Sequence, residues 1–241
     1  MDDLVLGAAH WEDIRWIKAG LSKAFEMTDL NELKVLLGLE ITRDRSQRQL
    51  TIHQQRYIDR IVNRYGMNDA RPIATPLDLH TKLLAGTKTD GEDNQIESVP
   101  IEAYQSAVGS LMYAMLGARP DIAYAIGLVS QFNHSPRWNH WLAVKRTFRY
   151  LGATRHWGLR YWTSNVSGRY SDADWGAGED QKSVGEFVFF LNGGAISWTG
   201  KKQNSIELST TEAESMAMTQ ATKDILWLRV LLDKLGAFAH I

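Results

Sequence analysis

The sequence contains no cysteine, only 5 prolines and almost no net charge. Without cysteine, disulfide bonds and thiolate zinc sites are excluded. Lysine and arginine number 27 against 28 aspartate and glutamate residues, so any basic surface for nucleic acid must be local. No uncharged apolar run reaches the roughly 18–20 residues of a membrane span. No basic leader precedes an apolar core at the start. We therefore expect a soluble intracellular protein, cytoplasmic or nuclear, with no membrane partner.

Hydrophobic side chains make up 44% of the 241 residues, enough for one large domain or two modest ones. The first segment, 1–70, reads as strand, helix, hairpin and helix. We predict a short buried strand at 4–8 and a helix from Trp11. Alternating apolar residues over 37–52 predict a β-hairpin, and a helical face follows from Tyr57 to Tyr65.

The rest of the chain divides by composition into three further segments. Residues 71–103 hold prolines, glycines and charges without a sustained period and are predicted to be a linker. Helices are expected over 104–160, with a break at Arg119-Pro120. Residues 161–241 are rich in predicted strands and close with a helix over about 211–235. The sequences "NGG" and "TGKK" in this segment predict hairpin turns.

Two carboxylates stand on a predicted strand, although aspartate is a poor strand former. In "RYSDADW", alternation places Asp172 and Asp174 on one face. Alternatively, the two aspartates lie at the end of a strand, just before a glycine-rich loop, where aspartate is common.

A second acidic pair lies in "LSTTEAESMAM". Ser209 and Glu212 fit a capping box, which explains Glu212. Glu214 heads the apolar stripe that continues through Ala217 and Ala221, and a carboxylate there needs a partner. That partner is either a lysine of "GKKQ" (Lys201 or Lys202) or a metal ion.

Together, Asp172 and Glu214 are placed to meet where a strand end adjoins the first turn of a packed helix. Hard oxygen ligands suit Mg²⁺ or Mn²⁺, and paired divalent ions are the usual device for in-line attack on a phosphodiester. The spacing therefore predicts a shared metal site.

Two local basic groups are candidates for nucleic-acid binding. The first is on the segment "HWLAVKRTFRYLGA" and the second is "GKKQNS", beside the acidic residues. Lysine and arginine in such groups provide salt-dependent affinity for phosphates. The first group also fits an ordinary solvated helix face. The candidate residues are Lys145, Arg146, Arg149, Lys201, Lys202 and Gln203.

Several long motifs occur here in a fixed order: "YQSAVGSLMYAMLGARPDIAYAIGLVSQF", "HWLAVKRTFRYL", "YSDADWGAG", "VFFLNGGAISWTGKKQ" and "LSTTEAES". Their order and their amino-acid sequences closely resemble the C-terminal part of the Pol polyprotein of copia-type LTR retrotransposons. The upstream "FEMTDLNELKVLLGLEITRD" and "RYGMNDARPIATP" resemble the region just before it. The resemblance implies an α+β fold: a reverse transcriptase palm/thumb remnant, then connection helices, then an incomplete ribonuclease H-like domain with a three-stranded antiparallel sheet and one helix.

The resemblance also implies roles for four carboxylates. The opening "MDDLVLG" is similar to the Tyr-x-Asp-Asp box of reverse transcriptases with its first residue removed, so Asp2 and Asp3 match the metal-binding pair. Asp172 matches the first catalytic aspartate of ribonuclease H and Glu214 the glutamate of its first helix. The implied cofactor is Mg²⁺ or Mn²⁺, and the hairpin over 37–52 resembles the element that positions the primer strand.

The implied function is that of a Pol fragment acting on an RNA–DNA hybrid, with the remaining polyprotein as a possible partner. Family members have a further aspartate on each site, upstream of Met1 and beyond Ile241, so we expect a catalytically incomplete fragment. Glu186 replaces an expected glycine, which is tolerable if its side chain faces solvent. The alternative function is a non-catalytic relic that binds nucleic acid or a partner.

Overall fold

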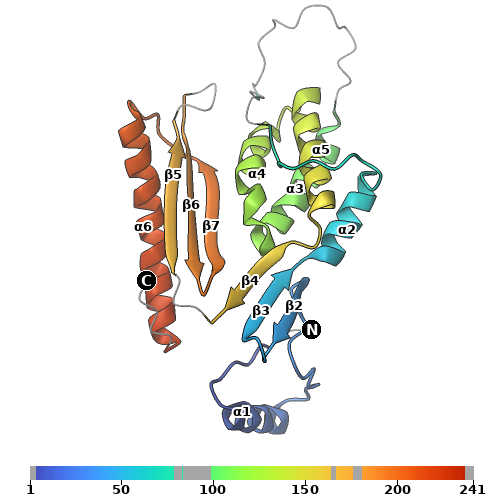
Figure 1. The fold of residues 1–241 in the computed structure, drawn as a ribbon, viewed down its shortest axis with the longest axis vertical. Coiled ribbons are helices and arrows are strands. Elements are labelled where there is room, and N and C mark those ends of the chain that lie inside the picture. Colours follow the sequence, from blue (N-terminus) through green and yellow to red (C-terminus); the bar gives the residue numbers. More distant parts are fainter. Residues whose placement is uncertain (1–3, 79–82, 84–98, 164–166, 176–180, 237–241) are drawn as a thin grey trace, which may run out of the picture.

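The computed structural model describes residues 4–78, 83, 99–163, 167–175 and 181–236. Asp2 and Asp3 lie outside the described residues. Helices and two antiparallel sheets are both present, as expected for an α+β protein (Figure 1). The elements are α1 (Trp11–Ala24), β1 (Val35–Leu36), β2 (Leu39–Asp44), β3 (Gln49–His53), α2 (Gln55–Arg64), α3 (Ile101–Ala118), α4 (Ala123–Val129), α5 (Trp138–Ala153), β4 (Gly158–Trp162), β5 (Gly168–Asp174), β6 (Val184–Leu191), β7 (Gly194–Lys202) and α6 (Thr210–Lys234).

The first sheet has the order β1-β2-β3-β4. The predicted hairpin forms its centre, with Ile41 opposite Ile52. Strand β4 then returns from the helices and pairs with β3, so that Leu159 lies opposite Ile52. The segment predicted as a strand at 4–8 is not one, because the structure has no strand before β1 in its described residues. Its apolar residues Leu4 and Val5 are exposed, with no neighbouring strand to cover them.

Helices α2 to α5 form the largest hydrophobic core, which centres on Tyr104, Leu111 and Phe148. Part of the predicted linker takes part in this core, since Leu77 and Val99 are both buried against it. The expected helix break is confirmed: α3 ends at Ala118, a 3-10 turn covers Pro120–Ile122, and α4 follows.

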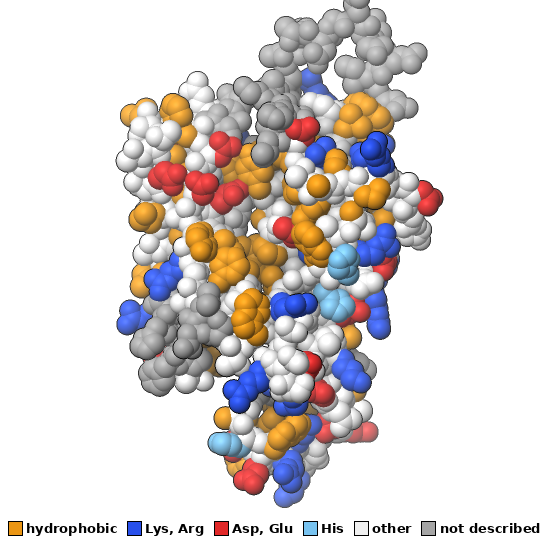
Figure 2. Space-filling model, viewed as in Figure 1, with side chains coloured by type: hydrophobic (Ala, Val, Ile, Leu, Met, Phe, Trp, Pro, Cys, Tyr) orange, Lys and Arg blue, Asp and Glu red, His pale blue; other side chains and the backbone are white. Residues whose placement is uncertain are grey.

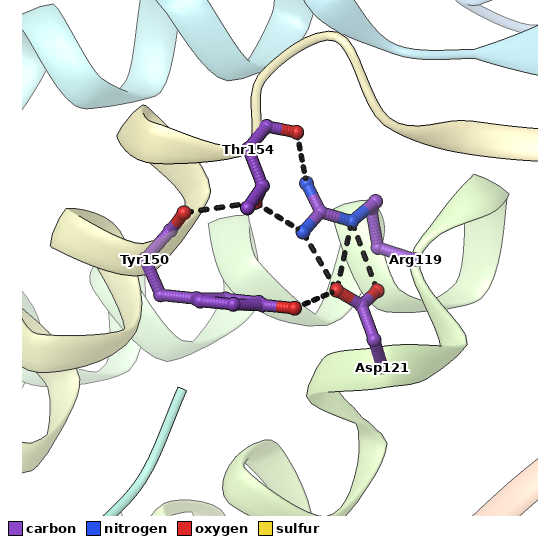
Figure 3. A network of polar contacts seen from close by, with 4 residues as sticks. All are labelled: Arg119, Asp121, Tyr150 and Thr154. Carbon is purple, nitrogen blue, oxygen red and sulfur yellow. Dashed lines mark hydrogen bonds and ion pairs between the residues drawn. The ribbon is translucent and has the colours of Figure 1, made fainter. Parts of the chain in front are cut away.

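Four residues hold this break against the end of α5 (Figure 3). The buried Arg119 guanidinium donates from Nε and Nη2 to the Asp121 carboxylate at 2.9 and 2.7 Å. It also donates to the carbonyl oxygen and Oγ1 of Thr154 at 3.1 and 2.6 Å. The Tyr150 hydroxyl donates to Asp121 at 2.7 Å, and burial raises the pKa of this phenol to about 12, with the Asp121 carboxylate adding to the shift. Arg119 therefore joins two helices through one satisfied polar network.

The second sheet has the order β5-β6-β7, and α6 packs on one of its faces. The predicted "NGG" turn is confirmed, because Asn192 and Gly193 both have positive φ and connect β6 to β7. The predicted "TGKK" turn is wrong, because β7 runs without interruption through Gly200 to Lys202.

Gly200 has a packing function instead. A Cβ at Gly200 would lie 3.1 Å from the backbone of α4, and a Cβ at Gly127 would lie 2.4 Å from the Gly200 carbonyl oxygen. These two glycines let β7 and α4 approach backbone to backbone. The second sheet is thereby covered by α6 on one side and approached by α4 on the other (Figure 1).

Among the described residues, no helix combines the length and apolar character that crossing a membrane requires.

Candidate functional site

The acidic residues of β5 and β6 lie on the sheet face opposite α6. Asp172 pairs directly with Glu186 across the two strands. The neighbours of Glu186 along β6 point toward α6: a Cβ at Gly185 would lie 3.5 Å from that of Ala217, and Phe187 packs with Ala221. Because side chains alternate along a strand, Glu186 and Asp172 point toward the connection helices.

Asp174 belongs to the same face and contacts α4. The Tyr124 hydroxyl donates to Oδ2 of Asp174 at 3.0 Å. Burial raises the pKa of the Tyr124 phenol, and the carboxylates of Asp174 and Glu186 raise it further. This hydrogen bond ties the acidic face to the helical core.

Glu186 is only half-exposed, whereas we expect its charge to be tolerable if the side chain faces solvent. Its Oε1 atom is buried without a hydrogen-bond partner. Burial raises the pKa of this carboxyl to about 7, and the negative charges of Asp172 and Asp174 raise it further. The cause of the burial is the close approach of α4, which periodicity in β6 cannot reveal.

We predict that Glu186→Gln stabilises the protein in a pH-dependent way. A carboxyl whose folded pKa is raised from 4.5 to about 7 binds its proton more tightly in the folded state. Folding therefore loses stability as the pH rises from about 4.5 through 7. After a discount for partial solvent screening, the glutamine variant should gain about 1–2 kcal/mol at pH 8 and almost nothing at pH 4.5.

Urea unfolding at the two pH values measures this difference. The matched control is Asp233→Asn, a charge removal at an exposed position of α6, which should show no such gain at pH 8 relative to pH 4.5. An equal effect of Glu186→Gln at both pH values would contradict the prediction.

Glu214 lies on α6, away from the acidic face of β5 and β6. It is exposed on α6, and the buried stripe of this helix is headed by Ala213, followed by Ala217 and Ala221. The prediction that Glu214 heads the buried stripe is therefore wrong by one position, a rotation of roughly 100° around the helix. The N-cap half of the predicted capping box is confirmed, because the Glu212 amide donates to Ser209 Oγ at 3.2 Å. The Glu212 carboxylate accepts from the amide of Leu208, at 2.8 Å, rather than from that of Ser209.

Asp172 and Glu214 are therefore not placed on one face: Asp172 points away from the sheet face on which α6 packs. Nor does any group of three or more His, Asp or Glu side chains within the described ranges converge closely enough to hold a metal ion. In this arrangement Asp172 and Glu214 do not share a metal site, while Asp2 and Asp3 lie outside the described residues.

The basic candidates on α5 contact the protein itself. Arg146 donates to Thr75 Oγ1 at 2.8 Å, and Arg149 donates to the carbonyl oxygen of Arg71 at 2.8 Å. Lys145 lies over the rings of two tryptophans of α5, at 4.8 Å from the centroid of Trp138. The arginines thus hold the segment after α2 against α5 and are only partly exposed, so they do not form the solvated helix face of the alternative. Nucleic-acid binding by this group stays a prediction.

The residues of the second basic group differ in their contacts and exposure. Lys202 Nζ donates to Gln131 Oε1 at 2.9 Å, and Gln203 Nε2 donates to the carbonyl oxygen of Ala213 at 3.0 Å. Both contacts tie β7 to neighbouring elements. Lys201 is exposed.

A basic cleft that the sequence reading missed lies at the tip of the β2–β3 hairpin. It has a volume of about 670 Å³ and is lined by residues of the hairpin, of β4 and of the β6–β7 turn. Among them are Arg43, Arg45 and Arg48, with Tyr161 and Trp162 across from the hairpin. Asp44 lies between the arginines in the sequence and also lines the cleft. Only strand pairing brings β4 beside these residues. We call this site the hairpin cleft.

Figure 2 shows a group of acidic side chains in the upper part of the α6 half, and basic and acidic side chains together at the lower end of the molecule, around this hairpin. Hydrophobic side chains are visible along the junction between the two halves.

Comparison with known proteins identifies relatives along nearly the whole chain. A family model described as reverse transcriptase (RNA-dependent DNA polymerase) matches residues 1–79. The retrovirus-related Pol polyprotein from transposon TNT 1-94 of Nicotiana tabacum is 42% identical, over 98% of this chain and 18% of that polyprotein. That from transposon RE1 of Arabidopsis thaliana is 37% identical, over 90% of this chain and 14% of the polyprotein.

A putative transposon Ty5-1 protein of Saccharomyces cerevisiae is 31% identical, over 93% of this chain and 72% of its own length. No solved structure matches the chain. The chain spans less than a fifth of the length of the two Pol polyproteins, at 18% and 14%. With a reverse transcriptase match at one end and such relatives along nearly all of its length, this chain belongs to the Pol polyprotein family of copia-type retrotransposons.

Proposed function

We propose that this chain is the part of a Pol polyprotein that holds an RNA–DNA hybrid between its polymerase and ribonuclease H regions. In this proposal residues 1–70 are the palm/thumb segment and 104–160 the connection helices. Residues 161–241 begin the ribonuclease H-like domain. The antiparallel order β5-β6-β7, followed by α6 packed on that sheet, supports the last assignment.

The hairpin cleft is the observation that carries the proposal. It joins the hairpin, which the family resemblance connects with the primer strand, to the turn between β6 and β7. Arg43 and Arg48 are exposed there, whereas Arg45 is already paired with Glu32 at 3.0 Å. Guanidinium groups supply salt-dependent phosphate contacts, and the exposed Trp162 offers a stacking surface.

We expect the double variant Arg43→Gln/Arg48→Gln to bind a labelled RNA–DNA hybrid about tenfold more weakly at moderate salt. The slope of log K against log salt should become shallower by about 2, one unit for each lost phosphate contact. Fluorescence anisotropy across a salt series measures both quantities. Arg229→Gln, an exposed arginine on α6, is the control and should leave the slope unchanged. An unaltered slope in the double variant would refute the role of the cleft.

Reverse transcriptases use divalent metal ions, and the resemblance assigns their ligands here to Asp2 and Asp3 for polymerisation and to Asp172 and Glu214 for RNA cleavage. Those assignments remain proposals. Because Asp172 and Glu214 do not share a face in the described arrangement, we propose binding of the hybrid, without cleavage, as the function of this conformation.

Cleavage of the RNA strand is the second candidate, and it rests on the position of Asp172 in the first strand of the second sheet. The test is a gel assay of a hybrid labelled on the RNA strand, with Mg²⁺ present. We expect intact RNA. Cleavage that is lost in Asp172→Asn, while hybrid binding is retained, would instead establish the nuclease.

A further inference from the structure

A second cavity, also of about 670 Å³, lies between the acidic face of the second sheet and the connection helices. Its lining comes from α4, β4 and all three strands of the second sheet. Asp172 and Glu186 contribute carboxylates, and Tyr170, Phe190 and Trp198 contribute aromatic side chains. We call this site the acidic cavity. It is distinct from the hairpin cleft, which the proposed function uses.

The lining of the acidic cavity holds more negative than positive side chains. The charges that act on Glu186 are those of Asp172 and Asp174, both negative. Asp121 also lines the cavity, but its carboxylate is engaged by Arg119 at 2.7 Å. Arg160 of β4, which is exposed, also lines the cavity and brings one positive charge, against the two carboxylates of Asp172 and Glu186. A buried carboxylate oxygen without a partner is costly, and a cation placed beside Glu186 would satisfy it.

The shape of the cavity favours an organic cation over a metal ion. No three of its carboxylates converge as metal ligands within the described part of the chain. Its volume suits a ligand of many atoms, and most such sites combine apolar walls with a few polar groups. Ring faces such as those of Trp198 and Tyr170 attract ammonium and guanidinium groups by cation–π interaction.

We propose that the acidic cavity binds an organic cation, an ammonium or guanidinium group carried on an apolar body, with Glu186 and Asp172 as its counter-ions. The proposal does not depend on the proposed binding of an RNA–DNA hybrid. A free amine and a lysine or arginine side chain of another polypeptide share this chemistry, so the experiment includes one probe for each.

The probes are phenethylammonium, its uncharged analogue 2-phenylethanol, and a capped Leu-Arg-Leu tripeptide, each titrated into the full chain at pH 8. Chemical shifts of indole N–H groups report binding, since Trp198 lines the cavity and donates to the carbonyl oxygen of Met115 at 3.1 Å. We expect phenethylammonium or the tripeptide to bind at least tenfold more tightly than the alcohol, with each dissociation constant measured from the shift of the Trp198 signal. The tighter of the two cationic probes identifies the source.

Glu186→Gln should weaken cation binding about tenfold, whereas Asp233→Asn, on the exposed side of α6, should leave it unchanged. Far-UV circular dichroism establishes that both variants remain folded. Equal affinity for the alcohol, unchanged affinity in Glu186→Gln, or a Trp198 shift produced by Mg²⁺ in preference to both cations would each overturn the proposal.

Discussion

Arg119→Ala is expected to destabilise the protein by about 3–5 kcal/mol, the usual result of removing one partner from a buried ion pair. Arg119 is 1% exposed and makes bonds to both Asp121 and Thr154. Without it, the Asp121 carboxylate loses its counter-ion, and the Thr154 carbonyl oxygen loses a donor inside the core. Chemical unfolding followed by circular dichroism measures the loss. The junction of α3 and α4 with the end of α5 should open first, because this network joins them.

A matched control is available in a second arginine–aspartate pair. Arg155 lies 3.0 Å from Asp59, but their side chains are 41% and 43% exposed. Arg155→Ala should therefore cost at most about 1 kcal/mol, as surface ion pairs do. Similar losses for the two variants would show that burial of the Arg119 network contributes nothing beyond the pair itself.

Gly127→Ala is expected to destabilise the protein by about 1–3 kcal/mol, although alanine is normally the better helix former. The added Cβ would lie 2.4 Å from the Gly200 carbonyl oxygen, which belongs to the backbone of β7 and cannot rotate away. Helix α4 and the second sheet must therefore separate. Because the acidic cavity lies at this same junction, the signal of Trp198 should shift in the variant.

The comparison variant is Gly109→Ala, on α3, where an added Cβ meets no atom within 4 Å. With no clash, the gain in helix propensity should stabilise the protein by about 0.5–1 kcal/mol. The measurement is the midpoint of thermal unfolding of each variant, compared with that of the parent protein. If Gly127→Ala also raises the midpoint, the close contact of α4 with β7 is not maintained in solution.

Local patterns in the sequence predicted much of the secondary structure. Alternation identified the hairpin of β2 and β3, and Pro120 identified the break between α3 and α4. Ser209 marked the start of α6, and Asn192-Gly193 marked the turn between β6 and β7. These features succeed because their causes lie within a few residues: a missing amide proton, a side-chain cap, or a backbone that requires positive φ.

The same reasoning misplaced features that depend on distant neighbours. Gly200 was read as a turn residue, because the chain that approaches it, α4, is more than seventy residues away in sequence. Glu214 was assigned to a buried stripe that begins at Ala213, since periodicity gives the spacing of a stripe but not its first member. Tertiary packing alone identified these positions.

The sequence by itself determined the family, most of the helices and strands, and the presence of acidic residues on β5. Only the tertiary structure decided which face those acids share, that Glu186 is half-buried beside Asp172, and that Arg146 and Arg149 hold the chain after α2. The physical reason is that a strand or helix pattern fixes which residues lie together on a face. What covers that face depends on elements that pack against it from elsewhere in the chain.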